Sequence, residues 1–273
     1  MNDQVNQQQA DELRQTVRDA YSKVAKADSS GDCCGEASSC CGVSDDEQIN
    51  AIISSRLGYS QSDREFVPDG ADMGLGCGNP RAIASLKTGE SVLDLGSGGG
   101  FDAFLAAQEV GDSGQVIGVD MTPSMVSKAR ENAEKGQFSQ VEFRLGEIEH
   151  LPVADNSIDV IISNCVINLS PDKIQVFNEM FRVLKPGGRL AISDVVAATE
   201  LPESMRSDPF LLSACVGGAE TIEKLEAIMQ EAGFSMINLQ PKDESSEFIR
   251  EWVPGKKVED FVLSATIEAK KQI

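Results

Sequence analysis

The chain has 273 residues, 41% of them hydrophobic, which suffices for one sizeable core or for a core domain with a smaller appendage. Its formal net charge is −20 and no stripe of Lys or Arg stands out, so we do not expect nucleic acid as a partner. No apolar run approaches the roughly 20 residues of a membrane-spanning helix, and the first residues lack the basic start and apolar stretch of a secretory signal, so we expect a cytoplasmic protein away from membranes.

The first 70 residues predict helices on either side of a cysteine-rich loop. Apolar residues recur at helical spacing within residues 1–27, at Leu13, Val17, Tyr21 and Val24. Residues 28–44 are rich in Ser, Gly and Cys, cannot bury much apolar surface, and predict a mobile loop. Ser44 and Glu47 then form a capping-box pattern. The apolar positions that follow it share one helical face: Ile49, Ile52, Ile53 and Leu57.

Alternating strands and helices begin after the glycine-rich run at 70–78 and a short helix that starts at Asn79-Pro80. Five strands are predicted from apolar, β-branched runs at 91–96, 115–120, 141–145, 157–164 and 189–196, and within the last run we expect the strand to end at Ser193-Asp194. Two of the connecting helices open with a cap residue and proline, at Thr122-Pro123 and Ser170-Pro171. This alternation predicts a parallel sheet covered on both faces.

Regularity is lost over residues 198–220, and a helix at 221–232 follows. Strand-like runs near 235–239 and 261–268 complete one edge of the sheet. The expected fold class is therefore α/β, a doubly wound Rossmann-like sheet. We divide the chain into N-terminal helices with the cysteine-rich loop (1–70), a Rossmann-like core (71–197) and a C-terminal α/β region (198–273).

The motif VLDLGSGGG, residues 92–100, ends the first strand and opens a helix, where glycines let the backbone approach a ligand. Its spacing, Gly96-x-Gly98-x-Gly100, differs from the G-x-G-x-x-G of dinucleotide enzymes. Asp94 lies in the strand end, and Asp120 follows the second strand, where an acidic side chain binds ribose hydroxyls. S-adenosylmethionine has no pyrophosphate, but its ammonium group needs a nearby negative field. The combination resembles class I methyltransferases, and the alternative is a nicotinamide or flavin Rossmann domain.

The resemblance to class I methyltransferases implies further cofactor contacts. Glu147 and Ile148 follow the third strand, where such enzymes contact adenine, although Glu147 by itself would read as a surface carboxylate. Asn164 ends the fourth strand and is expected to face the methyl donor. Ser97 in the glycine turn and Met121 beside Asp120 complete the expected cofactor site.

The seven cysteines cannot all pair, and in a cytoplasmic chain we expect reduced thiols that act as ligands or in redox chemistry. Cys165 ends the fourth strand, at the edge where open α/β sheets bind ligands, although a single Cys in an apolar strand is more often core filler. Cys77 lies in the glycine-rich loop before the first strand, and Cys215 in the irregular stretch after the fifth. Soft thiolates gathered over a methyl donor favour a soft acceptor.

Six segments together are similar to the arsenite S-adenosylmethionine methyltransferase family, from about residue 15 to the C-terminus: GLGCGNP, VLDLGSGGGFD, IGVDMTPSMVSKAR, SNCVINLSPDK, FRVLKPGGRLAISDVV and ACVGGA. SNCVINL and CVGGA, taken with GLGCG, are the most specific of them. The resemblance implies that Cys165 and Cys215 bind trivalent arsenic. It also implies that Cys77 completes the sulfur environment, and that residues 198–273 include an arsenic-binding segment.

The resemblance further implies a disulfide between Cys77 and an N-terminal cysteine during turnover. For that cysteine we favour Cys34 or Cys33 over Cys40 or Cys41. The alternative for the paired cysteines is a zinc or heavy-metal site, but the C-C-x₅-C-C spacing does not follow the usual zinc pattern.

The expected activity is that of an arsenite methyltransferase, which transfers methyl groups from S-adenosylmethionine to arsenite and methylarsenite for arsenic detoxification. Trivalent arsenic attacks through its lone pair, so no general base is needed, and we expect the single histidine, His150, at the surface. We expect a small-molecule arsenical substrate, thioredoxin or glutathione as the thiol reductant, and a monomer.

Two other functions stay open from the sequence. A C- or O-methyltransferase acting on a quinone-type acceptor shares the glycine and LKPGG turns, but its chemistry does not call for three placed cysteines. A thiol-rich arsenic or metal sequestration protein would retain the Rossmann portion as a relic, and the intact Asp94, Gly96, Gly98 and Asp120 argue against it.

Overall fold

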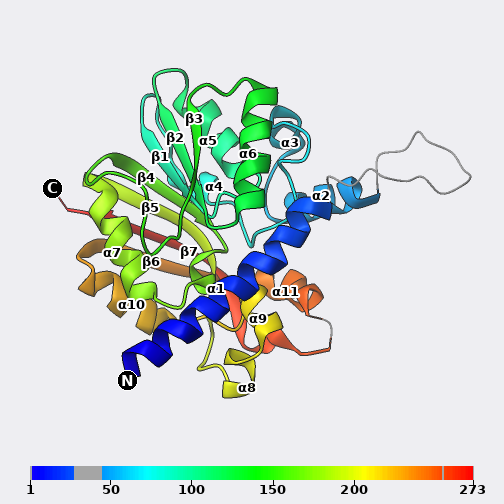
Figure 1. Ribbon diagram of the computed structural model, residues 1–273, viewed down its shortest axis with the longest axis vertical. Helices are drawn as coiled ribbons and strands as arrows, with labels where there is room; N and C mark the ends of the chain where they lie inside the picture. Colours follow the sequence, from blue (N-terminus) through cyan, green and yellow to red (C-terminus); the bar gives the residue numbers. More distant parts are fainter. Residues whose placement is uncertain (1, 28–44, 254, 273) are drawn as a thin grey trace, which may run out of the picture.

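The computed structural model describes residues 2–27, 45–253 and 255–272 (Figure 1). Cys33, Cys34, Cys40 and Cys41 lie outside the described residues, as does Ser44 of the capping pattern. No helix in these described ranges is both long enough and apolar enough to cross a membrane.

A seven-stranded sheet forms the centre of the molecule, in the order β3-β2-β1-β4-β5-β7-β6. Its strands are β1 Ser91–Leu95, β2 Gln115–Asp120, β3 Val141–Leu145, β4 Ile158–Asn164, β5 Leu184–Ala197, β6 Phe234–Lys242 and β7 Val262–Lys271. The first five are parallel, and β7 lies antiparallel between β5 and β6. The order reverses between β1 and β4. At such a switch point the connections leave the sheet in opposite directions and open a crevice at the carboxyl ends of the strands.

Helices cover both faces of the sheet. Their bounds are α1 Asn2–Ala27, α2 Asp45–Arg56, α3 Gln61–Phe66, α4 Arg81–Ala84, α5 Phe101–Val110, α6 Pro123–Gly136, α7 Lys173–Val183, α8 Glu203–Arg206, α9 Pro209–Ser213, α10 Ile222–Glu231 and α11 Ser246–Trp252, with 3₁₀ turns η1 Ile167–Leu169, η2 Asp243–Ser245 and η3 Val258–Asp260. Alternate strand residues face opposite layers: Val92 packs with α4, α5 and α6, and Leu93 with α7 and α10. The predicted doubly wound α/β fold is confirmed.

Helix α1 runs across the carboxyl ends of the strands and packs against α6 and α9 (Figure 1). Its apolar stripe is as predicted at Leu13, Val17 and Tyr21, but Val24 is exposed and Ala25 is buried in its place. Helix α1 therefore lies over the crevice and does not belong to either of the two helical layers that cover the faces of the sheet.

Three details of the sequence prediction are wrong. In α2, Ile49 and Ile52 are exposed, because the inward side is anchored by a polar contact in which Ser54 Oγ donates to Asp72 Oδ1 at 2.7 Å. Helix α7 begins at Lys173 with Asp172 as its N-cap, because Ser170 Oγ donates instead to Glu149.

The third detail is the end of the fifth strand. Strand β5 continues past Ser193-Asp194 to Ala197, because β7 pairs with it along that whole length. As a result Asp194 is a buried strand residue beside the crevice and not the start of a loop. The stretch at 198–220, expected to be irregular, contains the short helices α8 and α9.

Candidate active site

A cavity of about 1060 Å³, counted out to its mouth, lies at the carboxyl ends of β1, β2 and β4. The lining includes most of the predicted cofactor residues: Asp94, Gly96, Ser97, Gly98, Asp120, Met121, Ile148 and Asn164. Gly100 and Glu147 do not line it. Gly100 is the N-cap of α5 and packs against Phe104 and Phe143, and Glu147 points toward α1.

The glycine turn after β1 can exist only with glycine at its first position. Gly96 has φ +67°, and a Cβ there would lie 2.3 Å from Val166 Cγ2. The turn is held from β2, where Val119 O accepts from Gly96 N and Ser97 N, and Asp120 Oδ2 accepts from Gly98 N at 3.0 Å. The backbone at the start of α5 is thus exposed to whatever occupies the cavity, where helix N-termini favour polar ligands.

Three carboxyl groups line this cavity, the buried Asp94 and Asp102 and the half-buried Asp120. Burial raises the pKa of all three, and the repulsion of Asp102 and Asp120 raises that of Asp94 further. Among the described residues, Asp94 Oδ2 and Ser97 Oγ are buried without a hydrogen-bond partner. Unpaired buried acceptors are costly, so this donor-poor, negative site fits a ligand with an ammonium group and hydroxyls, as S-adenosylmethionine has.

Asn164 lines the cavity, but its amide is used within the protein. Its Oδ1 accepts from Cys77 N at 3.0 Å, and its Nδ2 donates to Gly78 O at 2.8 Å and to Tyr59 Oη at 3.0 Å. The Tyr59 hydroxyl in turn donates to Asp102 at 2.6 Å. Asn164 therefore ties the Cys77 loop to the end of β4.

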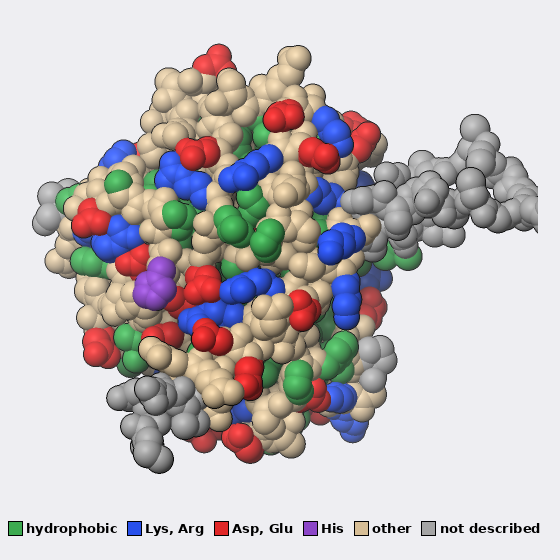
Figure 2. All heavy atoms as spheres, in the orientation of Figure 1, with side chains coloured by type: hydrophobic (Ala, Val, Ile, Leu, Met, Phe, Trp, Pro, Cys, Tyr) green, Lys and Arg blue, Asp and Glu red, His purple; other side chains and the backbone are tan. Residues whose placement is uncertain are grey.

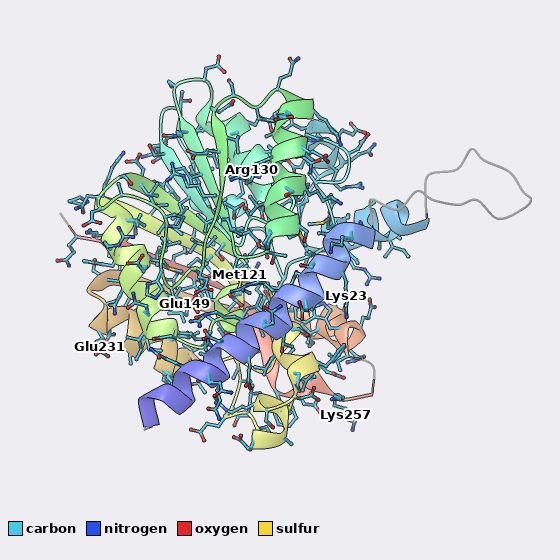
Figure 3. All side chains as sticks on the ribbon, in the orientation of Figure 1. Lys23, Met121, Arg130, Glu149, Glu231 and Lys257 are labelled. Carbon is cyan, nitrogen blue, oxygen red and sulfur yellow. The ribbon has the colours of Figure 1, made fainter. Side chains whose placement is uncertain are left out.

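Helix α1 closes one side of the cavity with Arg14, Val17 and Tyr21, which the sequence interpretation did not assign to the site. The Arg14 guanidinium pairs with Glu149 at 3.3 Å and with Glu147 at 3.5 Å. Figure 3 shows Glu149 and Met121 beside α1 at the centre of the molecule. The signal in the sequence was the apolar stripe that includes Val17 and Tyr21, which predicted a helix but not its place over the cavity.

Arg18 adds a further ion pair to Glu147, at 2.8 Å. Glu147 therefore pairs with α1, while its neighbours Ile148 and Glu149 line the cavity.

Three buried cysteines converge next to this cavity, and all three are free thiols. Cys77 Sγ, Cys165 Sγ and a carboxylate oxygen of Asp194 lie within 4.8 Å of one another. Cys215 Sγ donates to Cys165 O at 2.8 Å. The cysteines come from the loop before α4, the end of β4 and the segment after α9, so the fold brings together the three thiols that sequence reasoning singled out.

The surroundings of the cluster keep the thiols of Cys77 and Cys165 protonated. Hydrogen bonding with Cys215 and Cys77, together with burial, raises the pKa of Cys165 well above its usual value, and burial raises that of Cys77. Tyr21 from α1 approaches the same cluster, where burial and then the nearby Cys215 raise the pKa of its phenol. Cys77 and Cys165 are therefore held as neutral thiols.

His150 is exposed and does not line the cavity. Figure 2 shows it on the surface, on a face where Lys and Arg side chains are interspersed with Asp and Glu. It is not placed to act as a general base in this cavity.

Comparison with known proteins agrees with this geometry. The family model of a methyltransferase domain matches residues 86–233. An arsenite methyltransferase of Halobacterium salinarum is 53% identical over 268 residues, which cover 96% of this chain and 67% of that protein. One from Mus musculus is 37% identical over 249 residues, covering 86% of this chain and 61% of that protein. The chain thus spans about two thirds of the length of these relatives.

Among solved structures, the chain is similar to CrArsM, an arsenic(III) S-adenosylmethionine methyltransferase from Chlamydomonas reinhardtii. The TM-score is 0.60 at 34% identity, with 81% of this chain and 73% of that chain covered. With the glycine turn, the acidic cavity and the adjoining thiols, these similarities show that the chain belongs to the arsenite methyltransferase family of class I methyltransferases.

Proposed function

We propose that this chain methylates trivalent arsenic held by the thiolates of Cys77, Cys165 and Cys215, with S-adenosylmethionine as the methyl donor. The observation that carries the proposal is the convergence of three free, buried thiols beside a cavity lined by unpaired carboxylate and hydroxyl oxygens. Methylation of a quinone-type acceptor would not require the cysteine cluster. A sequestration protein would not require the cavity beside it.

Neutral thiols suit the capture of neutral arsenous acid. Each thiol proton leaves with one arsenic hydroxide as water, so an arsenic–sulfur bond forms without placing a net charge in a buried site. Because their pKa values are raised, Cys77 and Cys165 still carry those protons at neutral pH. Thiolate sulfur is also the soft ligand that a soft acceptor such as trivalent arsenic prefers.

On the donor side, Asp94 and the glycine turn would hold the amino acid end of the cofactor, and Asp120 the ribose. When bound, S-adenosylmethionine supplies an electrophilic methyl group, which the lone pair of trivalent arsenic takes up without loss of a proton. The chain needs no general base for this step, in agreement with the exposed His150. Its contribution is to hold the acceptor on sulfur and to exclude water beneath α1.

Methyl transfer formally oxidises arsenic from the trivalent to the pentavalent state. We propose that two thiols return the two electrons by forming a disulfide, between Cys77 and Cys34 or Cys33, the latter two outside the described residues. Reduced thioredoxin or glutathione would reopen the disulfide by thiol exchange. Methylarsenite would then re-enter the cycle as the second substrate.

We also propose that the chain works as a monomer in a reducing compartment such as the cytoplasm. All described cysteines are free thiols, which fits a reducing compartment. Sedimentation of the reduced protein with arsenite bound tests the first point, and a dimer would contradict it.

The test is a product profile. The full chain is incubated with arsenite, S-adenosylmethionine and reduced thioredoxin, and arsenicals are separated by chromatography with arsenic-specific detection. We expect methylated arsenicals from the wild type and none from a Cys165→Ser/Cys215→Ser double variant. Tight arsenite binding without methylated product would instead identify a sequestration protein, and methylation only of quinone-type acceptors would overturn the arsenic assignment.

A further inference from the structure

Behind the cysteine cluster lies a buried carboxylate, Asp194, whose acceptor positions are fully used. Its Oδ2 accepts from Val166 N at 3.1 Å and Ile167 N at 2.9 Å, and its Oδ1 accepts from Asn168 Nδ2 at 3.0 Å and Val195 N at 2.7 Å. Two of these donors are the amides that directly follow Cys165. Although Asp194 lies close to two sulfurs, four N–H groups already occupy it, so it is suited to hold the Cys165 turn and not to act as a ligand.

Asn168 extends this contact to the second arsenic-binding loop. Its side-chain Nδ2 bridges Asp194 and Val195 O, while its main-chain carbonyl lies against Gly218, three residues after Cys215. A Cβ on Gly218 would lie 2.0 Å from Asn168 O, so only glycine allows the two loops to approach this closely. One residue thus touches both the turn of Cys165 and the segment of Cys215.

Both cysteines have a backbone that needs such support. Cys165 has φ +59° and Cys215 has φ +60°, the left-handed region that residues with a Cβ rarely adopt. Such conformations persist only where the surrounding structure holds them. Cys165 is held on both sides, because its own N–H donates to Ser193 O at 2.8 Å and Asp194 accepts from the next two amides.

We propose that Asp194, Asn168 and Gly218 form a clamp that sets the spacing of the Cys165 and Cys215 sulfurs to the span of one trivalent arsenic atom. The proposal rests on the proposed function. The two sulfurs belong to loops 50 residues apart in the chain, and simultaneous bonding to one atom requires their separation to be preset. The three clamp residues are positioning residues, which act through the cysteines.

The test compares two variants that lose equivalent side chains. Asn168 and Asn132 are both buried amides, but Asn132 donates to Gly99 O in the glycine turn, on the cofactor side. We expect Asn168→Ala to weaken arsenite binding by about tenfold to a hundredfold, the range seen when residues behind a metal ligand are removed, with affinity for S-adenosylmethionine unchanged. Asn132→Ala is expected to weaken the binding of S-adenosylmethionine and to leave arsenite binding unchanged.

Two further measurements separate a positional effect from damage to the fold. Phenylarsine oxide binds two thiols, so Asn168→Ala should still bind it through Cys77 and Cys165. X-ray absorption at the arsenic edge should show fewer sulfur neighbours per arsenite in Asn168→Ala than in the wild type. Gly218→Ala, which forces the loops apart while leaving Asn168 intact, should give the same pattern, and the thermal midpoint of each variant is measured in parallel.

The outcomes are distinct for the two proposals. If the wild type does not bind arsenite through sulfur, the proposed function fails and the clamp with it. If the wild type binds arsenite through three sulfurs and Asn168→Ala does so with equal affinity, the clamp alone is overturned. Parallel losses of arsenite, phenylarsine oxide and cofactor binding in Asn168→Ala would also overturn it, because they indicate general unfolding.

Discussion

The thiol of Cys215 donates a 2.8 Å hydrogen bond to the main-chain carbonyl oxygen of Cys165. The bond joins a segment beyond β5 to the end of β4 and holds the Cys215 sulfur beside Cys165 before any substrate arrives. Preorganisation of this kind lowers the entropy lost when both sulfurs bind one atom.

Replacing either of these cysteines with serine should remove arsenite binding and leave cofactor binding intact. A serine oxygen can keep the hydrogen bond but is a hard ligand for trivalent arsenic. We expect Cys165→Ser and Cys215→Ser each to weaken arsenite affinity more than about a hundredfold, or ~2.7 kcal/mol, in calorimetric titration. Ser213→Ala, two residues from Cys215, serves as the control. Methylation of arsenite by either cysteine variant at the wild-type rate would disprove the ligand assignment.

Cys77→Ser should discriminate between substrates. Inorganic arsenite presents three exchangeable groups and methylarsenite two, so the loss of one thiol affects inorganic arsenite more. We expect the rate with arsenite to fall by at least about tenfold relative to the rate with methylarsenite, a difference of ~1.4 kcal/mol. Initial rates with each substrate, measured with excess reductant, give the ratio. Equal losses on both would argue against the role of Cys77 as third ligand and disulfide partner.

Asp120→Ala should weaken the binding of S-adenosylmethionine and leave arsenite binding unchanged. The carboxylate lines the cavity and also accepts from Gly98 N and Thr122 N, so its removal should loosen the glycine turn and remove the proposed ribose contact. We expect affinity for S-adenosylmethionine to fall by about tenfold to a hundredfold, or ~1.4–2.7 kcal/mol, with arsenite binding unchanged. The exposed Asp112 provides a matched control as Asp112→Ala. A cofactor titration identical to that of the wild type would show that Asp120 does not contact the ribose.

Arg14→Ala should loosen the packing of helix α1 against the cavity. Arg14 and Glu149 are largely buried, so their pairing contributes more than a surface ion pair does. We expect a loss of about 1 kcal/mol, roughly fivefold in cofactor affinity, mainly as a faster dissociation rate. Stopped-flow displacement of the cofactor measures that rate. Lys23→Ala, on an exposed face of the same helix, is the control (Figure 3). The same dissociation rate in all three proteins would show that α1 does not retain the cofactor.

Glu179→Gln tests the hydrogen bonds by which the Glu179 carboxylate holds Leu151, in the loop after β3. The Glu179 carboxylate accepts from Arg182 and from Leu151 N, and the hydrogen bond from Arg182 holds the pKa of Glu179 below its usual value. A carboxyl whose folded pKa is lowered stabilises the protein above its unfolded pKa of about 4.3, and that contribution is lost as the pH falls through the folded value. We expect Glu179→Gln to lower the free energy of unfolding by about 1–3 kcal/mol at pH 7.

Urea unfolding of the wild type and Glu179→Gln between pH 3 and pH 7 checks the sign, with the exposed Glu134→Gln as control. The difference between wild type and Glu179→Gln should shrink as the pH falls below about 4.3. A constant difference down to pH 3 would contradict this account.

Local patterns in the sequence determined most of the fold. Strand periodicity acts within windows of a few residues and predicted β1 to β5, and the spacing from Asp94 through the glycine turn to Asp120 picked out residues that line one cavity. The extension of β5 to Ala197 was missed because it depends on pairing with β7, which follows far along the chain. The same limit applies to Ile49 and Ile52, whose exposure depends on what α2 packs against.

The cysteines show the same difference between what the sequence indicates and what the tertiary structure decides. Their positions in the chain and the family resemblance singled out Cys77, Cys165 and Cys215, but only the folded chain shows that they lie together. The pairing of Glu147 with α1 depends on Arg14 and Arg18, more than a hundred residues away in sequence. Sequence by itself determined the turns, the strands and the chemistry available. Tertiary structure decided which distant groups meet, because ion pairs and close backbone contacts between remote segments leave no periodic signal in either segment.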